Sequence, residues 1–274
     1  MRVRPSRKMQ PPIYNSIGKN YNTTRQADPY LVERIYHLLQ AQKDKVYLDI
    51  GCGTGNYTIK LSEKGIRIIG VDPSEIMLDT AKLKSTTIEW RFGTAEEIPF
   101  ANETFDGAVA TLTMHHWKDI EKGFSELNRV IKFNGKLVIF TSTPEQMDGY
   151  WLNHYFPEMM IKSTQQMPTL EKIKSTAEIA GLEILGTENY FVKEDLKDLF
   201  LHAGKYNPEF YFNESNRKGI SSFAAISNAE EVNAGLKKLR RDIESGEIKN
   251  IQMQYENLFG DYLFIVLKKT SQAG

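Results

Sequence analysis

Apolar residues in the first half of the chain recur with two alternating periods, and this alternation predicts the architecture. Residues 31–39 carry Leu, Val or Ile at every third or fourth position, the spacing of a helix that buries one face. Asp28 and Pro29 precede them, as an N-cap residue and a first-turn proline do. Residues 46–50 form a short apolar run that ends in glycines, which predicts a buried strand.

The helix and strand patterns continue to alternate as far as residue 142. We expect further strands at 66–71, 88–92, 105–112 and 136–142, and further helices at 56–64, 74–84 and 118–132. Strands that alternate with helices are joined by right-handed crossovers, which produce a parallel sheet with helices on both faces. The pattern therefore predicts an α/β fold with a core at about 28–142.

After residue 142 the spacing changes. Helices are expected at 144–163 and 168–180, and strands at 182–192 and 262–268. About seventy residues separate these two strands, which is too long for a hairpin loop. Because they include a helical pattern of their own, we interpret residues 193–261 as a helical cap inserted before the last strand. That last strand is expected to run antiparallel at the far side of the sheet, paired near 182–192.

Composition and charge exclude several classes of protein. The chain has 274 residues, which suits a single domain at 13–274 behind a disordered tail at 1–12. Its 35 Lys and Arg balance 35 Asp and Glu, so the basic surface of a nucleic-acid-binding protein is not expected. The longest apolar runs are strand-sized, so no membrane span is expected. One cysteine, Cys52, allows no internal disulfide, and a cytoplasmic location follows.

The turn after the first strand carries the most informative motif. Gly51, Gly53 and Gly55 occupy every second position there, whereas a dinucleotide site has the spacing G-x-G-x-x-G. Glycines let a ligand approach the backbone closely, and the helix that follows begins with free N–H groups. Asp49 stands in front of the turn, where a carboxylate would repel a pyrophosphate and suit a ligand with an ammonium group. This pattern disfavours a nicotinamide-dependent oxidoreductase.

A second acidic residue, Asp72, closes the next strand. It lies about 20 residues after Gly53, the position from which a carboxylate can accept both hydroxyls of a ribose. An aspartate after a strand can also cap a helix, a role for which Ser74 competes here. Together, the glycine turn and Asp72 favour a ligand that contains a nucleoside.

Three motifs occur in order along the chain: Asp-Ile-Gly-Cys-Gly-Thr-Gly at 49–55, Gly-Val-Asp-Pro-Ser at 70–74 and Gly-Thr-Ala-Glu-Glu-Ile-Pro-Phe at 93–100. They resemble the motifs of class I S-adenosylmethionine-dependent methyltransferases, in particular the ubiquinone/menaquinone-biosynthesis-like (methyltransferase type 11) group. The resemblance implies S-adenosyl-L-methionine as cofactor. It also implies a Rossmann-like, seven-stranded, mostly parallel sheet with an antiparallel last strand.

The resemblance further implies individual roles. Asp49 would order the site near the amino group of the cofactor, Asp72 would bind its ribose hydroxyls, and Thr111 would place a backbone carbonyl near the ammonium group. Residues 13–27 would form an N-terminal lid whose tyrosines close over the cofactor, although ordinary packing would explain them as well. The full set of implied cofactor-binding residues is Tyr14, Tyr21, Asp49, Gly51, Gly53, Gly55, Asp72, Met77, Ala95, Glu96 and Thr111.

The candidate catalytic residues follow the strand at 105–112, at the end of the sheet where ligands gather. His116, and after it His115, could take a proton from a hydroxyl or an acidic carbon. The alternative is that both only shape the pocket floor, because alignment of the reactants alone can supply on the order of 7 to 11 kcal/mol. No third ligand accompanies the two histidines, so no metal site is predicted. Cys52 is interpreted as structural, since methyl transfer needs no enzyme nucleophile.

Aromatic residues gather at 150–156 and 206–212. Trp151, Tyr155 and Phe210 are therefore candidates for the wall of a substrate pocket that takes an apolar or planar acceptor. The alternative is that they form the core of the cap.

The sequence thus predicts transfer of a methyl group from S-adenosylmethionine to an oxygen, nitrogen or carbon centre of a small molecule. Two alternatives remain open: a tRNA nucleoside methyltransferase, and a non-catalytic cofactor-binding partner subunit. The balanced charge disfavours the first, and the intact glycine turn disfavours the second.

Overall fold

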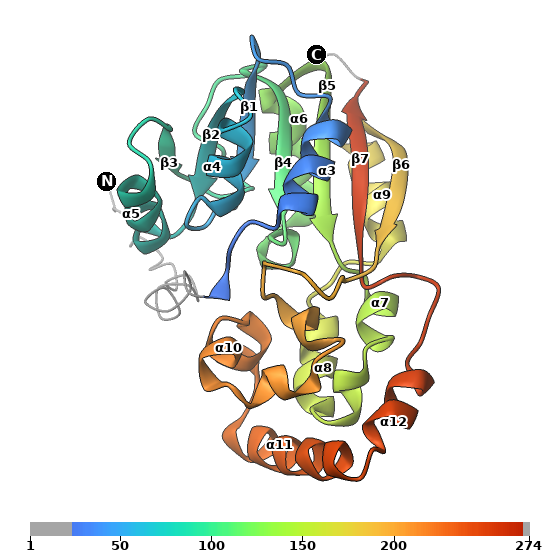
Figure 1. Ribbon diagram of the computed structural model, residues 1–274. Helices are drawn as coiled ribbons and strands as arrows, with labels where there is room; N and C mark the ends of the chain where they lie inside the picture. The colour runs from blue at the N-terminus through green and yellow to red at the C-terminus, as the bar shows by residue number, and fades with distance from the viewer. Residues whose placement is uncertain (1–23, 271–274) are drawn as a thin grey trace, which may run out of the picture.

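The computed structural model describes residues 24–270, whose strands form one sheet in the order β3-β2-β1-β4-β5-β7-β6 (Figure 1). The strands are β1 Val46–Ile50, β2 Arg67–Asp72, β3 Trp90–Phe92, β4 Phe105–Thr111, β5 Ile131–Thr141, β6 Leu182–Tyr190 and β7 Tyr262–Lys269. The helices that accompany the sheet are α3 Pro29–Leu39, α4 Asn56–Ser62, α5 Glu75–Lys84, α6 Ile120–Val130 and α9 Leu170–Ile179.

Strand directions confirm the predicted architecture. β1 to β5 are mutually parallel, while β7 runs antiparallel to both β5 and β6. β7 lies one strand in from the edge of the sheet, because β6 pairs with its outer side. The order reverses between β1 and β4, and a crevice for ligands opens at such a point in an open α/β sheet.

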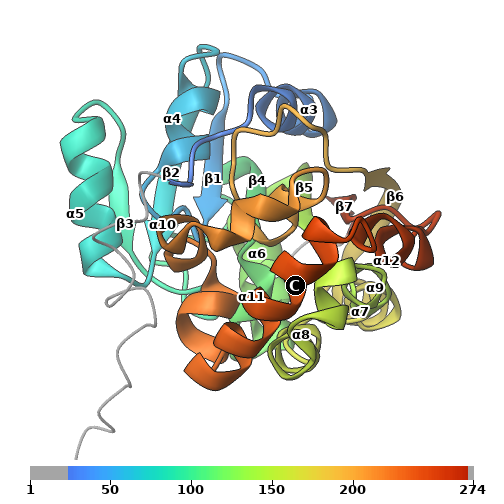
Figure 2. The ribbon, with the colours of Figure 1, turned by 60° about the horizontal axis from the view of Figure 1, so that its bottom comes forward.

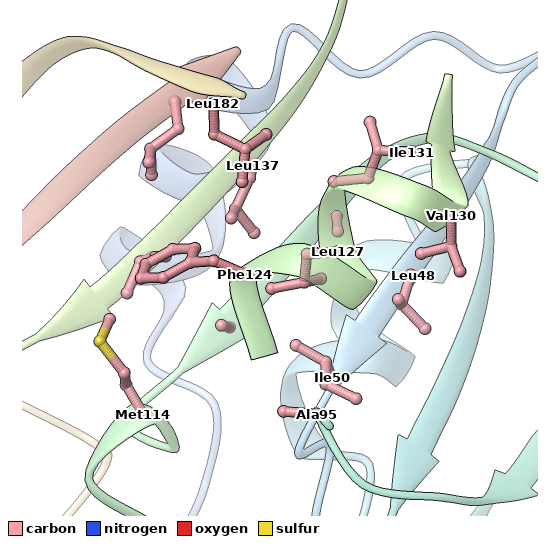
Figure 3. Close-up of a cluster of buried hydrophobic side chains, with 14 of the residues drawn as sticks. Leu48, Ile50, Ala95, Met114, Phe124, Leu127, Val130, Ile131, Leu137 and Leu182 are labelled. Atoms are coloured by element: carbon pink, nitrogen blue, oxygen red, sulfur yellow. The ribbon is translucent and has the colours of Figure 1, made fainter. Parts of the chain in front are cut away.

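Two apolar layers hold helices against the sheet. α6 and α9 cover one face, where Leu48 of β1 packs near Leu127 of α6 in a cluster of fully buried side chains (Figure 3). α3 and α4 cover the other face, where Ile35 and Leu61 belong to a second cluster with Val138 of β5. Asp28 caps α3 as predicted, and its side chain accepts a hydrogen bond from the N–H of Leu31.

The junction between α6 and β5 differs from the prediction. The sequence pattern predicted a helix at 118–132 and a strand at 136–142, but β5 already begins at Ile131, which pairs with Phe105. Asn134 and Gly135 instead form an irregularity inside the strand, with Asn134 at φ +66°. Glycine is needed at 135 because an added Cβ would lie 2.8 Å from the carbonyl oxygen of Asp106.

A helical lobe lies beyond the carboxyl ends of the strands (Figures 1 and 2). Its helices are α7 Pro144–Asp148, α8 Pro157–Thr164, α10 Glu214–Lys218, α11 Ala229–Glu244 and α12 Ile248–Gln254, with 3₁₀ turns at Trp151–His154, Leu201–Gly204 and Pro208–Phe212. The lobe combines the segment after β5 with the insertion before β7, and residues of both share one buried core.

The helix predicted at 144–163 is broken into three pieces, and this expectation was wrong. Pro157 explains the second break, because a proline lacks the N–H for an interior helical bond and is instead accommodated at the start of α8. Between residues 24 and 270, no helix is long and apolar enough to cross a membrane.

Candidate active site

A cavity opens at the carboxyl ends of β1, β2 and β4, where the strand order reverses. The predicted residues that line it are Asp49, Gly51, Gly53, Asp72, Met77, Thr111 and His116. The fold therefore brings together predicted residues from the ends of three strands, β1, β2 and β4, and from the segments that follow them.

The glycine turn is fixed by its neighbours. The N–H groups of Gly51 and Cys52 both donate to the carbonyl of Val71, at 2.8 and 3.1 Å, which ties the turn to β2. Gly51 has φ +72°, and a Cβ there would lie 1.9 Å from Oγ1 of Thr113. Gly53 has φ +54°, but a Cβ on it would meet no atom of residues 24–270 within 4 Å. The space above Gly53 is therefore open to a ligand, whereas Gly51 is needed for packing.

Gly55 has a different place from the other two glycines. It is the N-cap of α4, with φ +77°, and a Cβ on it would lie 2.4 Å from the Trp90 ring. Gly55 does not line the cavity; it allows α4 to approach β3 closely.

Burial and the charges of Asp72 and Asp49 raise the pKa of the Cys52 thiol well above its usual value, so this thiol stays protonated.

Asp72 is held in place by both of its oxygens. Oδ2 accepts the N–H of Gly53 and Oδ1 accepts the N–H of Ser74, each at 2.8 Å. Burial raises the pKa of Asp72 to about 6, although these two hydrogen bonds act in the opposite direction. The carboxylate thus lies fixed in the cavity wall, and its oxygens have lone pairs left for ligand hydroxyls.

Asp49 lies deeper, at the end of β1. Burial raises its pKa to about 7; the hydrogen bond from Thr58 Oγ1, at 2.6 Å, lowers the pKa, and the charge of Asp72 raises it. Within the described part of the chain, no Lys, Arg or His forms an ion pair with Asp49. A buried carboxylate of this kind is stabilised by a positively charged ligand group.

The two histidines follow β4 in a 3₁₀ turn, Met114–His116, with their rings 3.9 Å apart. His116 lines the cavity and His115 does not. Burial, and after it the charge of Arg25, lowers the pKa of His116 to about 4. His115 has its pKa lowered well below the usual value by the same burial and by His116. His116 is therefore neutral at physiological pH.

Two predicted residues lie beside the cavity rather than in its wall. Ala95 is buried in the hydrophobic cluster on the face of the sheet that α6 and α9 cover. Glu96 accepts the N–H groups of Lys118 and Asp119, at 2.6 and 3.2 Å, and so holds the entry to α6. Tyr14 and Tyr21 lie outside the described residues, as does most of the predicted lid at 13–27.

The sequence analysis missed one group of cavity residues. Arg25 forms a bidentate ion pair with Asp198, whose carboxylate also accepts the hydroxyl of Tyr57 at 3.1 Å. All three line the cavity. Arg25 and Asp198 are 173 residues apart, so no local motif could have paired them. This pair joins the chain before α3 to the segment that leads into the helical lobe.

The predicted substrate-pocket residues lie in the lobe and do not line this cavity. Trp151 and Tyr155 are buried in the core of the lobe, and Phe210 packs against it. The Trp151 Nε1–H donates to the carbonyl of Lys205 at 3.3 Å, and the Tyr155 hydroxyl donates to Asp242 at 3.3 Å. Trp151 borders a second cavity, whereas Tyr155 and Phe210 face neither.

A Rossmann-like sheet with an antiparallel β7, together with a glycine turn beside two buried acids, is typical of the methyltransferase fold. Comparisons with known proteins agree. The methyltransferase domain family matches residues 48–139. A demethylmenaquinone methyltransferase of Oceanobacillus iheyensis is 31% identical over 61% of this chain and 71% of its own length.

Solved structures extend the likeness to the helical lobe. A protein of Anabaena variabilis, described as a methyltransferase of an antibiotic biosynthesis pathway, is 32% identical with a TM-score of 0.79. That match covers 89% of this chain and 98% of the other. A geranyl diphosphate C-methyltransferase of Streptomyces coelicolor, solved with S-adenosyl-L-homocysteine, shares the fold at 14% identity and a TM-score of 0.55, over 88% of this chain and 78% of its own. The chain belongs to the S-adenosylmethionine-dependent methyltransferases of class I.

Proposed function

We propose that the protein transfers the methyl group of S-adenosylmethionine to a small molecule, and that the cavity at β1, β2 and β4 holds the cofactor. The observation that carries this proposal is the pair of buried carboxylates, Asp49 and Asp72, beside the open space above Gly53. One ligand that offers hydroxyl groups and an ammonium group would satisfy both acids at once.

The chemistry of the lining residues fits this cofactor part by part. Asp72 would accept the ribose hydroxyls, and Asp49 would lie near the amino group, as would the backbone carbonyl of Thr111. Met77, buried at the start of α5, would pack on the adenine. Ala95, by its backbone, and Glu96 would face the polar edge of the adenine from beside the cavity wall.

The remaining residues implied by the family resemblance would complete the cofactor site. Gly51 and Gly53 would bring the backbone close to the methionine and ribose parts, and Gly55 would support the turn from outside the cavity by letting α4 approach β3. Tyr14 and Tyr21 would close the site from the lid.

When bound, the cofactor supplies a methyl group already activated on a sulfonium centre. The work left to the protein is to align the acceptor and exclude water, and alignment can contribute on the order of 7 to 11 kcal/mol. His116 is the proposed proton acceptor, with His115 behind it. Since its pKa is about 4, His116 is a weak base. It can assist acceptors whose nucleophilic atom carries an acidic proton, and an acceptor whose nucleophilic atom carries no proton needs no base.

A small acceptor is supported by charge and by relatives. The 35 basic and 35 acidic side chains provide no excess of positive charge for a tRNA backbone. The name of the Oceanobacillus relative refers to demethylmenaquinone, which is a small molecule. We place the acceptor between the end of β4 and the helical lobe, because the lobe is the part of the described chain that covers this end of the sheet.

Cofactor identity is tested by calorimetry with S-adenosyl-L-homocysteine and, separately, with NAD. The proposal predicts one saturable site for the first ligand and little binding of the second. Tight NAD binding without S-adenosyl-L-homocysteine binding would overturn it. Binding without turnover on any small-molecule or tRNA pool would instead support a non-catalytic partner subunit.

A further inference from the structure

A second cavity, of about 620 Å³, lies at the helical lobe on the side of the loop that leads into β7. Three segments line it: residues 149–151 after α7, Lys205 with Tyr206, and residues from 252 to 258 at the end of α12. Among the described residues, none lines both this cavity and the one at β1, β2 and β4. Its volume lies in the range of small-molecule pockets, roughly 300 to 1,000 Å³.

Hydrogen bonds between the three segments fix the walls. The backbone carbonyl of Lys205 accepts both Trp151 Nε1–H, at 3.3 Å, and Gln252 Nε2–H, at 2.9 Å. The side-chain amide of Asn257 donates to the carbonyl of Gly149 at 3.2 Å. Each segment is thus tied to another without help from a ligand, so the cavity is preformed and little ordering is needed on binding.

The charges around this cavity favour an uncharged ligand. The ammonium group of Lys205 lies 2.8 and 3.0 Å from the two oxygens of Asp261, a buried carboxylate that neutralises it. Glu256 is exposed and adds a negative charge at the rim. The Lys205–Asp261 pair carries no net charge, and the remaining charge at the rim, on Glu256, is exposed and screened by solvent, so neither an anion nor a cation gains a strong ion pair in this cavity. Either ion would also lose its hydration, a cost that a neutral molecule avoids.

The groups left available on the walls are aromatic faces and hydroxyls. The hydroxyls of Tyr206 and Tyr255 make no hydrogen bond to any residue between 24 and 270. The Lys205 ammonium lies 5.6 Å from the centre of the Tyr206 ring, a cation–π distance that helps to hold this ring in the cavity wall. Leu258, 90% exposed at the rim, adds apolar surface that a ligand could cover. These surfaces suit a flat ring with hydroxyl substituents.

We propose that the second cavity binds an uncharged, flat aromatic molecule that carries hydroxyl groups. The site is separate from the cofactor cavity, so a ligand there is distinct from the S-adenosyl group, and the inference does not depend on the proposed reaction.

The proposal is tested with three probes that share the naphthalene ring system and differ in charge: 1-naphthol, 1-naphthoate and 1-naphthylmethylammonium. Each is titrated calorimetrically into the protein. We expect 1-naphthol to bind one site at least about tenfold more tightly than either ion. Tyr255→Ala and Leu258→Glu should each weaken 1-naphthol binding by about five- to tenfold. Ile179→Glu is the matched control, since Ile179 is 87% exposed on α9 and lines neither cavity.

Saturation with S-adenosyl-L-homocysteine distinguishes the two cavities. The proposal predicts that 1-naphthol binds equally well in its presence, and equally well to Asp72→Ala. Displacement of 1-naphthol by S-adenosyl-L-homocysteine would overturn the proposal. So would an absence of 1-naphthol binding, equal binding of the three probes, or indifference to both Tyr255→Ala and Leu258→Glu.

Discussion

The backbone N–H of Gly53 donates a 2.8 Å hydrogen bond to Oδ2 of Asp72, which joins the glycine turn to the end of β2. The two predicted cofactor motifs are therefore parts of one structure. Asp72→Ala removes a ligand for the cofactor and a restraint on the turn together. We expect it to weaken S-adenosyl-L-homocysteine binding by roughly 1 to 3 kcal/mol, as measured by calorimetry.

Glu75→Ala is the control for Asp72→Ala. Glu75 is an exposed acid three residues further on, and its replacement changes the net charge by the same amount. The affinity of Glu75→Ala for S-adenosyl-L-homocysteine should stay within about a factor of two of that of the parent protein. Equal losses in both variants would show that general charge, and not the Asp72 contact, determines the affinity.

Asp49 should make the cofactor-free protein less stable as the pH rises. Its folded pKa of about 7 lies above the ordinary value of 3.8, so the folded protein holds the proton more tightly than the unfolded chain does. Stability from this group is complete below pH 4 and is lost as the pH rises to about 7. Asp49→Asn should therefore gain roughly 1 to 3 kcal/mol over the parent at pH 8, and much less at pH 4.5, in urea unfolding.

The same substitution should harm cofactor binding. Asparagine lacks the charge that stabilises an ammonium group, so S-adenosyl-L-homocysteine should bind Asp49→Asn at least about tenfold more weakly at pH 7.5. For the parent protein, affinity should rise between pH 5.5 and 7.5 as Asp49 ionises. A pH-independent affinity in this range would contradict the role given to Asp49.

Gly51 and Gly53 should respond differently to alanine. Gly51→Ala places a Cβ 1.9 Å from Thr113 Oγ1 and should cost about 2 to 4 kcal/mol of unfolding free energy, because a clash adds to the strain of a positive φ. The Cβ of Gly53→Ala meets no atom of the described residues within 4 Å, so this variant should cost only about 1 to 2 kcal/mol.

The second readout for these alanines is cofactor affinity. The Cβ of Gly53→Ala projects into the space assigned to the ligand, so this variant should lose affinity out of proportion to its stability. Equal stability losses in the two variants, or full affinity in Gly53→Ala, would contradict the assignment.

His116→Ala should lower turnover on the true acceptor by about 10²-fold or more, with cofactor affinity nearly unchanged. His115→Ala is the matched neighbour outside the cavity wall and should lose less than about tenfold. Because the pKa of His116 is about 4, protonation of His116 should not lower the rate near pH 6.5. The parent protein and His116→Ala should therefore show the same pH dependence of the rate around pH 6.5. Near-normal turnover in His116→Ala would leave His116 as pocket wall, with catalysis by positioning alone.

Local patterns predicted the parts of the structure that depend on neighbouring residues. β1 was predicted residue for residue at Val46–Ile50, since a buried strand followed by glycines allows few alternatives. The junction at Asn134 was predicted wrongly, because an asparagine–glycine pair has the same local signature in a turn and inside an irregular strand.

Contacts between distant segments could not be predicted from the sequence. Arg25 and Asp198 are 173 residues apart in the sequence, and only the fold brings them together. The aromatic residues of the lobe illustrate the same limit. Trp151 and Tyr155 were candidates for a substrate wall from composition, yet packing places both in the core of the lobe, which composition alone cannot distinguish from a pocket.

Methyl transfer itself is the most direct test of the account. The protein is incubated with methyl-deuterated S-adenosylmethionine and, in parallel, with a small-molecule extract or a tRNA pool, and both are analysed by mass spectrometry. The account predicts one labelled methyl group on a small molecule, with less label from Asp72→Ala at sub-saturating cofactor and less label from His116→Ala at any cofactor concentration. Label confined to tRNA, or no label in either pool while S-adenosyl-L-homocysteine binds, would contradict it.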